Sequence, residues 1–120
     1  MRLRILFLMA VMGLTFLSVN AWAEMVSFTI VIKDHKFTPE ELTIPANEKV
    51  KLFVENHDAT AEEFESYDLN REKIVIGNGK IILFIGPLKP GTYKYFGDFH
   101  QDTAQGTIVV ADNSRNEEKK

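Results

Sequence analysis

Short segments in which every second residue is apolar fill most of the chain after residue 24, and they limit the fold that it can adopt. The clearest of these segments are residues 28–32, 50–54 and 81–85. Successive side chains of a β-strand point to opposite faces, so this period of two predicts strands that each bury one face. Turn-forming residues separate the segments, as at residues 45–47 and 86–91. Short strands with turns at this spacing predict an all-β Greek-key antiparallel β-sandwich.

We expect seven or eight strands, with a core built from the apolar side chains that lie in phase within each segment. The side chains expected to point inward are Phe28, Ile30, Val50, Leu52, Phe64, Leu83, Tyr93 and Val110. The pair Asn78 and Gly79 lies between two further apolar segments, a setting that favours a β-hairpin. The sequence therefore predicts that residues 73–76 pair with residues 80–83.

The first 23 residues have the pattern of a secretory signal peptide. Arg2 and Arg4 precede a predominantly apolar stretch at residues 5–17, and residues 21–23 read Ala-Trp-Ala, a typical cleavage motif. The 13 residues of this stretch are fewer than the roughly 20 that a membrane span requires. We expect cleavage near Ala23 and a periplasmic or secreted protein, with an uncleaved N-terminal anchor as the alternative.

The rest of the chain divides into one domain, residues 24–111, and a polar tail, residues 112–120, for which we expect disorder. Without Arg2 and Arg4 the chain holds 12 basic and 17 acidic residues, a net charge of −5. Such a surface repels phosphate backbones, which argues against nucleic acid as a partner. The chain has no cysteine, so its stability must come from the apolar core instead of disulfides.

The sequence lacks the common catalytic patterns. It has no G-x-S-x-G or H-E-x-x-H motif, no phosphate-binding glycine loop and no cysteine nucleophile. We therefore expect that the protein is not an enzyme.

The order of several segments resembles the cupredoxin family. The segments are residues 37–44, the strand end at Asn56 with Phe64 after it, the Gly-Pro-Leu-Lys-Pro-Gly-Thr-Tyr run at 86–93, and the final Gly-Thr-Ile-Val-Val at 106–110. The resemblance covers nearly the whole chain after residue 24 and implies a cupredoxin-like sandwich.

Three of the four usual blue-copper ligands of that family are replaced. Where the resemblance implies the first histidine ligand, the chain has Glu62 or Glu63. The strand that would end at the ligand cysteine ends here with Gly97 and Asp98. Ala104 stands where the resemblance implies the axial methionine. His100 falls in the loop where the family keeps an imidazole. Blue-copper electron transfer needs a cysteine thiolate, so this chemistry is excluded.

A closer resemblance is to the cysteine-poor periplasmic type, similar to the N-terminal cupredoxin domain of bacterial iron-uptake proteins. It implies that carboxylates share or replace the soft ligands and that a membrane metal permease is a possible partner. Glu63 and Glu65 lie on one face of an extended strand. Asp98 and His100 lie on one face of the later strand if that strand stays extended as far as His100. Oxygen and imidazole ligands suit Fe(III), Mn(II), Zn(II) or Cu(II). If the family frame joins the two segments, the predicted metal site is Glu62, Glu63, Glu65, Asp98 and His100.

Two functions follow from these observations. The first is a periplasmic or secreted metal-binding accessory protein that supports iron or copper uptake with a membrane permease, with Cu(II) or iron as its ion. The second is a metal-free sandwich that acts as a protein-interaction or structural module, in which the glutamates only solvate a strand edge. We interpret His35 and His57, both in polar loops, as solvent-exposed or turn-stabilising residues.

Overall fold

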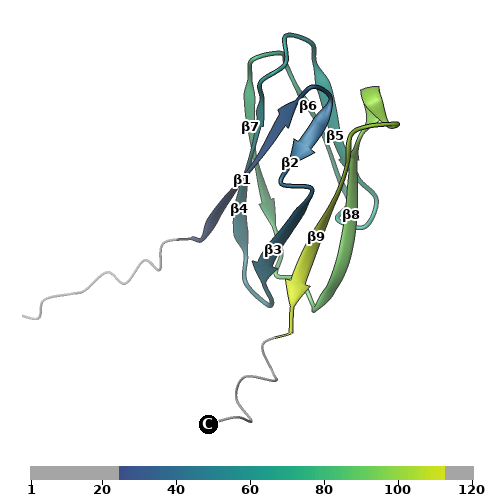
Figure 1. The fold of residues 1–120 in the computed structure, drawn as a ribbon. Helices are drawn as coiled ribbons and strands as arrows, with labels where there is room; N and C mark the ends of the chain where they lie inside the picture. The colour runs from purple at the N-terminus through teal and green to yellow at the C-terminus, as the bar shows by residue number, and fades with distance from the viewer. Residues whose placement is uncertain (1–24, 113–120) are drawn as a thin grey trace, which may run out of the picture.

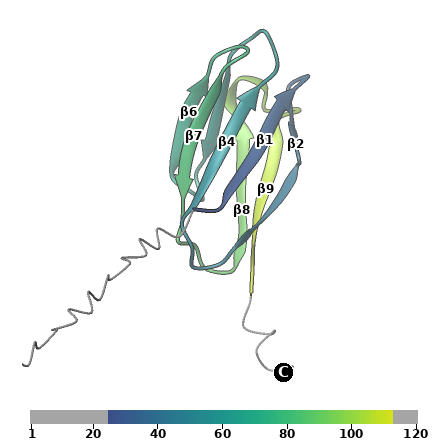
Figure 2. The same ribbon diagram turned by 90° about the vertical axis from the view of Figure 1, so that its left-hand side faces the viewer.

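The computed structural model describes residues 25–112, which form two facing β-sheets (Figures 1 and 2). The predicted signal peptide and the predicted tail beyond Asp112 lie outside the described residues. The strands in the described part are β1 (Ser27–Lys33), β2 (Lys36–Thr38), β3 (Glu41–Pro45), β4 (Val50–Asn56), β5 (Glu62–Ser66), β6 (Arg71–Val75), β7 (Lys80–Ile85), β8 (Gly91–Gly97) and β9 (Gln105–Ala111). A single 3-10 turn, η1 (Asp98–His100), follows β8.

The two sheets confirm the predicted all-β sandwich. One sheet has the strand order β2-β1-β4-β7, and the other has the order β3-β9-β8-β5-β6. Most neighbouring strands are antiparallel, while β1 with β4 and β3 with β9 are parallel. The described residues hold nine strands instead of seven or eight, because the chain reverses at Asp34 and His35 and adds the short β2. None of the described residues forms a helix long and apolar enough to cross a membrane.

The core lies between the sheets and follows the predicted phase of the strands. Of the eight side chains expected to point inward, six are buried, and Phe28 and Tyr93 are partly buried and pack against them. Tyr95 is fully buried, with its ring centroid 4.9 Å from that of Phe37 and 5.0 Å from that of Phe64. Such contacts between aromatic rings add to the stability given by apolar burial alone. This aromatic cluster joins the two sheets, because Phe37 lies on β2 and the other two rings lie on β5 and β8.

The predicted hairpin at Asn78 and Gly79 is wrong. β6 pairs with β5 in one sheet and β7 pairs with β4 in the other, so the turn between them crosses from sheet to sheet. The turn packs against the loop after β4: the N–H of Asn78 donates to the carbonyl of Asp58 at 2.8 Å. A Cβ on Gly77 would lie 2.0 Å from the carbonyl oxygen of Ala59. Close packing against the backbone of Ala59 therefore explains why residue 77 is a glycine.

Leu52 tests this core. Its side chain is 1% exposed at the centre of β4, so Leu52→Ala should lower the free energy of unfolding by about 2–5 kcal/mol. Ile82→Ala on the outer face of β7, where the residue is 41% exposed, should cost less. Urea unfolding of the two variants measures the difference. Equal losses would contradict the inward position of Leu52.

Candidate functional site

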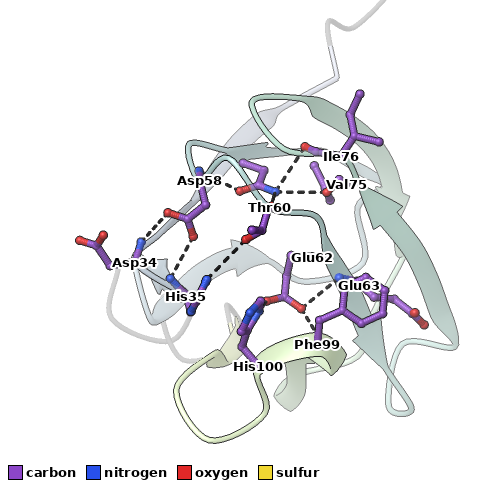
Figure 3. Close-up of polar contacts among 11 residues, drawn as sticks. Asp34, His35, Asp58, Thr60, Glu62, Glu63, Val75, Ile76, Phe99 and His100 are labelled. Atoms are coloured by element: carbon purple, nitrogen blue, oxygen red, sulfur yellow. Dashed lines mark hydrogen bonds and ion pairs between the residues drawn. The ribbon is translucent and has the colours of Figure 1, made fainter.

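Glu62 and His100, two of the predicted site residues, lie at one end of the sandwich, where three connections meet (Figure 3). These are the turn between β1 and β2, the loop between β4 and β5, and the segment from η1 to β9. Glu62 is the first residue of β5, and His100 is the last residue of η1. The sandwich therefore brings together residues that are 38 positions apart in the sequence.

Glu62 is the most completely buried acidic residue in the described part of the chain, at 1% exposure. Its Oε2 lies 2.5 Å from Nδ1 of His100, and its Oε1 accepts hydrogen bonds from the backbone N–H of Phe99 at 2.9 Å and of Glu63 at 3.0 Å. Burying a carboxylate is costly unless such donors replace water. The three contacts fix the carboxylate with one oxygen toward His100, whose side chain is 26% exposed.

The space around Glu62 explains two of the missing copper ligands. A Cβ on Gly97 would lie 2.6 Å from Cδ of Glu62 and 2.7 Å from Cβ of Ala104. Gly97 and Ala104 are the positions where the resemblance implies cysteine and methionine. The buried carboxylate thus occupies the space next to the position of the absent thiolate.

His35, which the sequence analysis assigned to a polar loop, lies against His100. The two imidazole rings are stacked, with centroids 3.5 Å apart and an angle of 12° between their planes. The carboxylate of Asp58 holds the β1–β2 turn by accepting from the N–H of Asp34 at 2.8 Å and of His35 at 3.0 Å. The hydrogen bond from the His35 backbone is the main cause that lowers the pKa of Asp58.

Asn56 fixes the loop that leads from β4 to Glu62. Its buried amide donates to the carbonyl oxygens of Thr60, Val75 and Ile76, and its own carbonyl accepts from the N–H of Asp58 at 3.0 Å. Figure 3 shows these contacts beside the histidine pair. One side chain therefore orders the loop that holds the β1–β2 turn and, through it, His35.

A second group of carboxylates lies on the opposite face of β5. One carboxylate oxygen each from Glu63, Glu65 and Glu72 lies within 4.8 Å of the others, and Glu65 faces Glu72 directly across the β5–β6 pair. A hydrogen bond to Glu72, loss of solvent and the charges of Glu72, Asp98 and Glu65 raise the pKa of Glu63 to about 7. Loss of solvent, followed by the charge of Asp98, raises the pKa of Glu65.

The five predicted site residues therefore form two groups instead of one. Glu62 and His100 meet inside the end of the sandwich, while Glu63 and Glu65 lie on the outer face, within electrostatic range of Asp98. Adjacent residues of a strand point to opposite faces, which separates Glu62 from Glu63. Glu72 and His35 were not among the predicted site residues. A short turn at residues 34–35 between two alternating segments was the signal that could have placed His35 at a sandwich end.

The ligand atoms at this end suit some metal ions and exclude one type of centre. They are a carboxylate oxygen and two imidazoles, with no thiolate or thioether among Glu62, Gly97, His100 and Ala104. A hollow of about 480 Å³ lies beside the rings and is lined by His35, Asp98 and residues 99–103. Oxygen and imidazole ligands fit Cu(II), Zn(II) or Fe, whereas a blue-copper centre does not fit.

Comparisons with known proteins agree with this fold. The family model described as "Cupredoxin-like domain" matches residues 5–110. An uncharacterized protein of Rickettsia prowazekii (strain Madrid E) is 57% identical over 83 residues, which are 69% of this chain and 66% of that protein. The chain thus spans just under two thirds of the length of that relative.

Several solved structures have a similar fold. Auracyanin A, a blue copper protein from Chloroflexus aurantiacus, has a TM-score of 0.62 at 19% identity, covering 72% of this chain and 98% of that one. The metal binding domain of the Streptococcus pneumoniae D39 Cu(I) exporting P-type ATPase CopA has a TM-score of 0.64 at 8% identity, covering 72% and 85%. A purple cupredoxin from Nitrosopumilus maritimus has a TM-score of 0.53 at 20% identity, covering 69% and 98%. These identities establish the shared fold alone.

The acidic group predicts how stability depends on pH. The folded protein raises the pKa of Glu63 from 4.5 to about 7, so between these values the folded state binds more protons than the unfolded state. The free energy of unfolding should therefore fall as pH rises from about 4.5 to 7 through this group. Glu72→Gln removes the first cause of the shift and should flatten this fall. Urea unfolding at pH 5 and 7.5 measures it, with Glu41→Gln on β3 as control. An unchanged pH dependence in Glu72→Gln would contradict the assignment.

Gly97 tests the packing around Glu62. Gly97→Ala places a methyl group against the buried carboxylate and Ala104, so it should destabilise the fold by about 1–3 kcal/mol. Asp102→Ala changes an exposed residue of the same loop and should stay within about 0.5 kcal/mol of the parent protein. Thermal unfolding compares the two. A neutral Gly97→Ala would show that Glu62 can leave its position easily.

Proposed function

The chain belongs to the family of cupredoxin-like domains, and from that premise we propose that it binds a divalent metal ion, Cu(II) foremost, through Glu62 and His100. The observation that supports this most is the contact of 2.5 Å between Oε2 of Glu62 and Nδ1 of His100. Both atoms are metal-ligand types, and they meet at the end of the sandwich where the resemblance implies the metal site. A metal ion bound to both atoms would take the place of the hydrogen bond between them.

His35 supports the same proposal. Its ring contacts that of His100 and borders the same hollow, so a second imidazole lies beside the pair. Asp58 and Asn56 hold the turn and the loop around it, as outer residues do around metal ligands. Oxygen and imidazole ligands stabilise Cu(II) and disfavour Cu(I). Bound copper would therefore be suited to storage or transfer of the ion instead of electron exchange.

We also propose the cellular role: an accessory protein outside the cytoplasm that passes copper or iron to a membrane permease, with no catalytic activity of its own. The signal-peptide pattern of residues 1–23 supports the location. One structural neighbour, auracyanin A, is a blue copper protein, which supports the choice of copper. The lack of catalytic sequence patterns supports a binding role.

One observation favours the second candidate function, a metal-free module for protein interaction. Both oxygens of the Glu62 carboxylate already have partners, so this end of the sandwich is complete without an ion. No polar side-chain atom that is buried in the described residues lacks a hydrogen bond. A metal must therefore compete with contacts that already stabilise the fold.

Cu(II) titration of residues 24–120 tests the metal proposal. We expect one site whose electron paramagnetic resonance spectrum shows coupling to imidazole nitrogen, with no intense blue band because no thiolate is present. His100→Ala should weaken binding by more than about tenfold, as loss of a ligand exceeds loss of an outer residue. His57→Ala changes an exposed histidine and should leave binding unchanged. Binding should weaken as pH falls, because both ligands bind metal in their deprotonated forms.

A pair of glutamate variants separates the two faces of β5. Glu62→Gln should weaken Cu(II) binding, while Glu65→Gln makes the same change on the outer face and should not. Calorimetry at pH 7.5 measures both. Equal affinities for the parent protein, Glu62→Gln and His100→Ala would contradict the proposal, and so would a complete lack of binding. Either result would favour the metal-free module.

A further inference from the structure

The outer face of the β2-β1-β4-β7 sheet combines lysine and phenylalanine side chains. Figure 2 shows this face toward the viewer. In β4 and β7 the outward positions alternate with buried ones, and the register places Lys51 beside Phe84 and Phe53 beside Ile82. We call Lys49, Lys51, Phe53, Lys80, Ile82 and Phe84 the lysine–phenylalanine face.

Three ammonium groups on this face lie over aromatic rings. Nζ of Lys49 is 5.4 Å from the ring centroid of Phe84, and Nζ of Lys80 is 5.2 Å from that of Phe53. Nζ of Lys51 lies between the two rings, 5.9 Å from each centroid. Phe84 and Ile82 are 44% and 41% exposed. Rings and ammonium groups therefore share one solvent-facing surface.

These lysines have no acidic partner among the described residues. The ion pairs in this part of the chain are His57 with Glu55 and His100 with Glu62. Glu55 is the sole acidic residue at an outward strand position of this sheet. It lies opposite Lys80 in the β4–β7 register, but its ion pair is with His57, at 3.2 Å. The three positive charges are therefore available to an anionic partner.

The rest of the molecule has the opposite charge. The strands of the other sheet hold five acidic and three basic residues: Glu41, Glu62, Glu63, Glu65 and Glu72 against Arg71, Lys73 and Lys94. The chain after residue 23 has a net charge of −5. An anionic surface would repel that sheet and attract the lysine–phenylalanine face, so charge complementarity sets one orientation.

We propose that the lysine–phenylalanine face docks the protein on an anionic phospholipid bilayer. Lysines attract anionic headgroups while their alkyl stems lie along apolar surface, and the exposed phenyl rings and Ile82 enter the headgroup boundary. Exposed Met25 and Val26 extend the apolar surface at the edge of the face, since the carbonyl of Val26 accepts from the N–H of Lys51 at 2.9 Å. A lipid surface fits a broad sheet face with mixed rings and charges. The proposed metal ligands Glu62 and His100 are not part of the lysine–phenylalanine face.

Flotation with lipid vesicles tests this docking. The experiment uses residues 24–120, because every described strand and the core lie in residues 25–112, and the apolar stretch 5–17 would bind bilayers by itself. Vesicles of phosphatidylcholine alone are compared with vesicles that contain phosphatidylglycerol. We expect binding to the anionic vesicles only, and weaker binding as salt rises.

Variants locate the contact. Each lysine near an anionic bilayer contributes about fivefold to affinity, so replacing Lys49, Lys51 and Lys80 by Glu should reduce binding about 100-fold or more. The matched control reverses three exposed lysines elsewhere, Lys73, Lys89 and Lys94, and should lose much less. Phe84→Ser should weaken binding at unchanged net charge. Circular dichroism checks that each variant is folded.

Three results would overturn the proposal: no binding of the folded parent protein to anionic vesicles, equal losses in the two triple variants, or full binding by Phe84→Ser. The first result would instead favour an acidic protein surface as the partner of the lysine–phenylalanine face. Because the metal ligands are not altered in any of these variants, Cu(II) affinity reports separately on the proposed metal function.

Discussion

The burial of one carboxylate governs the architecture at the end of the sandwich that holds the candidate site. An ionised group inside a protein costs several kcal/mol unless donors replace its water. Here Glu62 receives two backbone N–H groups and an imidazole, and each comes from a segment that must be held in place. Gly97 leaves the space that the carboxylate fills, and η1 presents the N–H of Phe99. Asn56 orders the neighbouring loop. The loops at this end are therefore arranged around one side chain.

The pleat of β5 gives the same short run of glutamates two different chemistries. Glu62 points into the sandwich, where fixed donors surround it, whereas Glu63 and Glu65 point outward beside Glu72. There the hydrogen bond to Glu72 is the main cause that raises the pKa of Glu63, and loss of solvent is the main cause that raises the pKa of Glu65. The inner site offers mixed oxygen and nitrogen ligands, which suits Cu(II). The outer group offers oxygen alone, on a surface where repulsion between carboxylates is relieved by protonation. A count of acidic residues in the sequence cannot distinguish the inner glutamate from the outer ones, because neighbouring residues of a strand point to opposite faces of the sheet.

Local period and turn chemistry were enough to predict the sandwich and the inward phase of β1, β4 and β7, and the resemblance to cupredoxins placed His100 in the loop after β8. They did not predict features of the fold that depend on contacts between residues far apart in the sequence. Asn78 and Gly79 look like a hairpin turn, yet the turn crosses between the sheets because it hydrogen-bonds to the loop after β4. His35 looked like a loop residue, and only the packing of two distant turns places it on His100. The family frame joined Glu62 and His100 in one predicted site, but the two backbone donors of Glu62, from Glu63 and Phe99, could not be predicted for the same reason.

The shared fold does not transfer the chemistry of a blue-copper protein, because the positions that would restore it depend on each other. A cysteine at Gly97 would place its Cβ 2.6 Å from Cδ of Glu62, so the thiolate position and the carboxylate exclude one another. Removing the carboxylate alone would leave His100 and two backbone N–H groups without their acceptor, at a cost of about 1–3 kcal/mol for each buried group. Each single step away from the present arrangement is therefore destabilising. The carboxylate–imidazole pair is a self-consistent alternative that the same β-sandwich supports, and any metal ion bound there must be one that hard ligands favour.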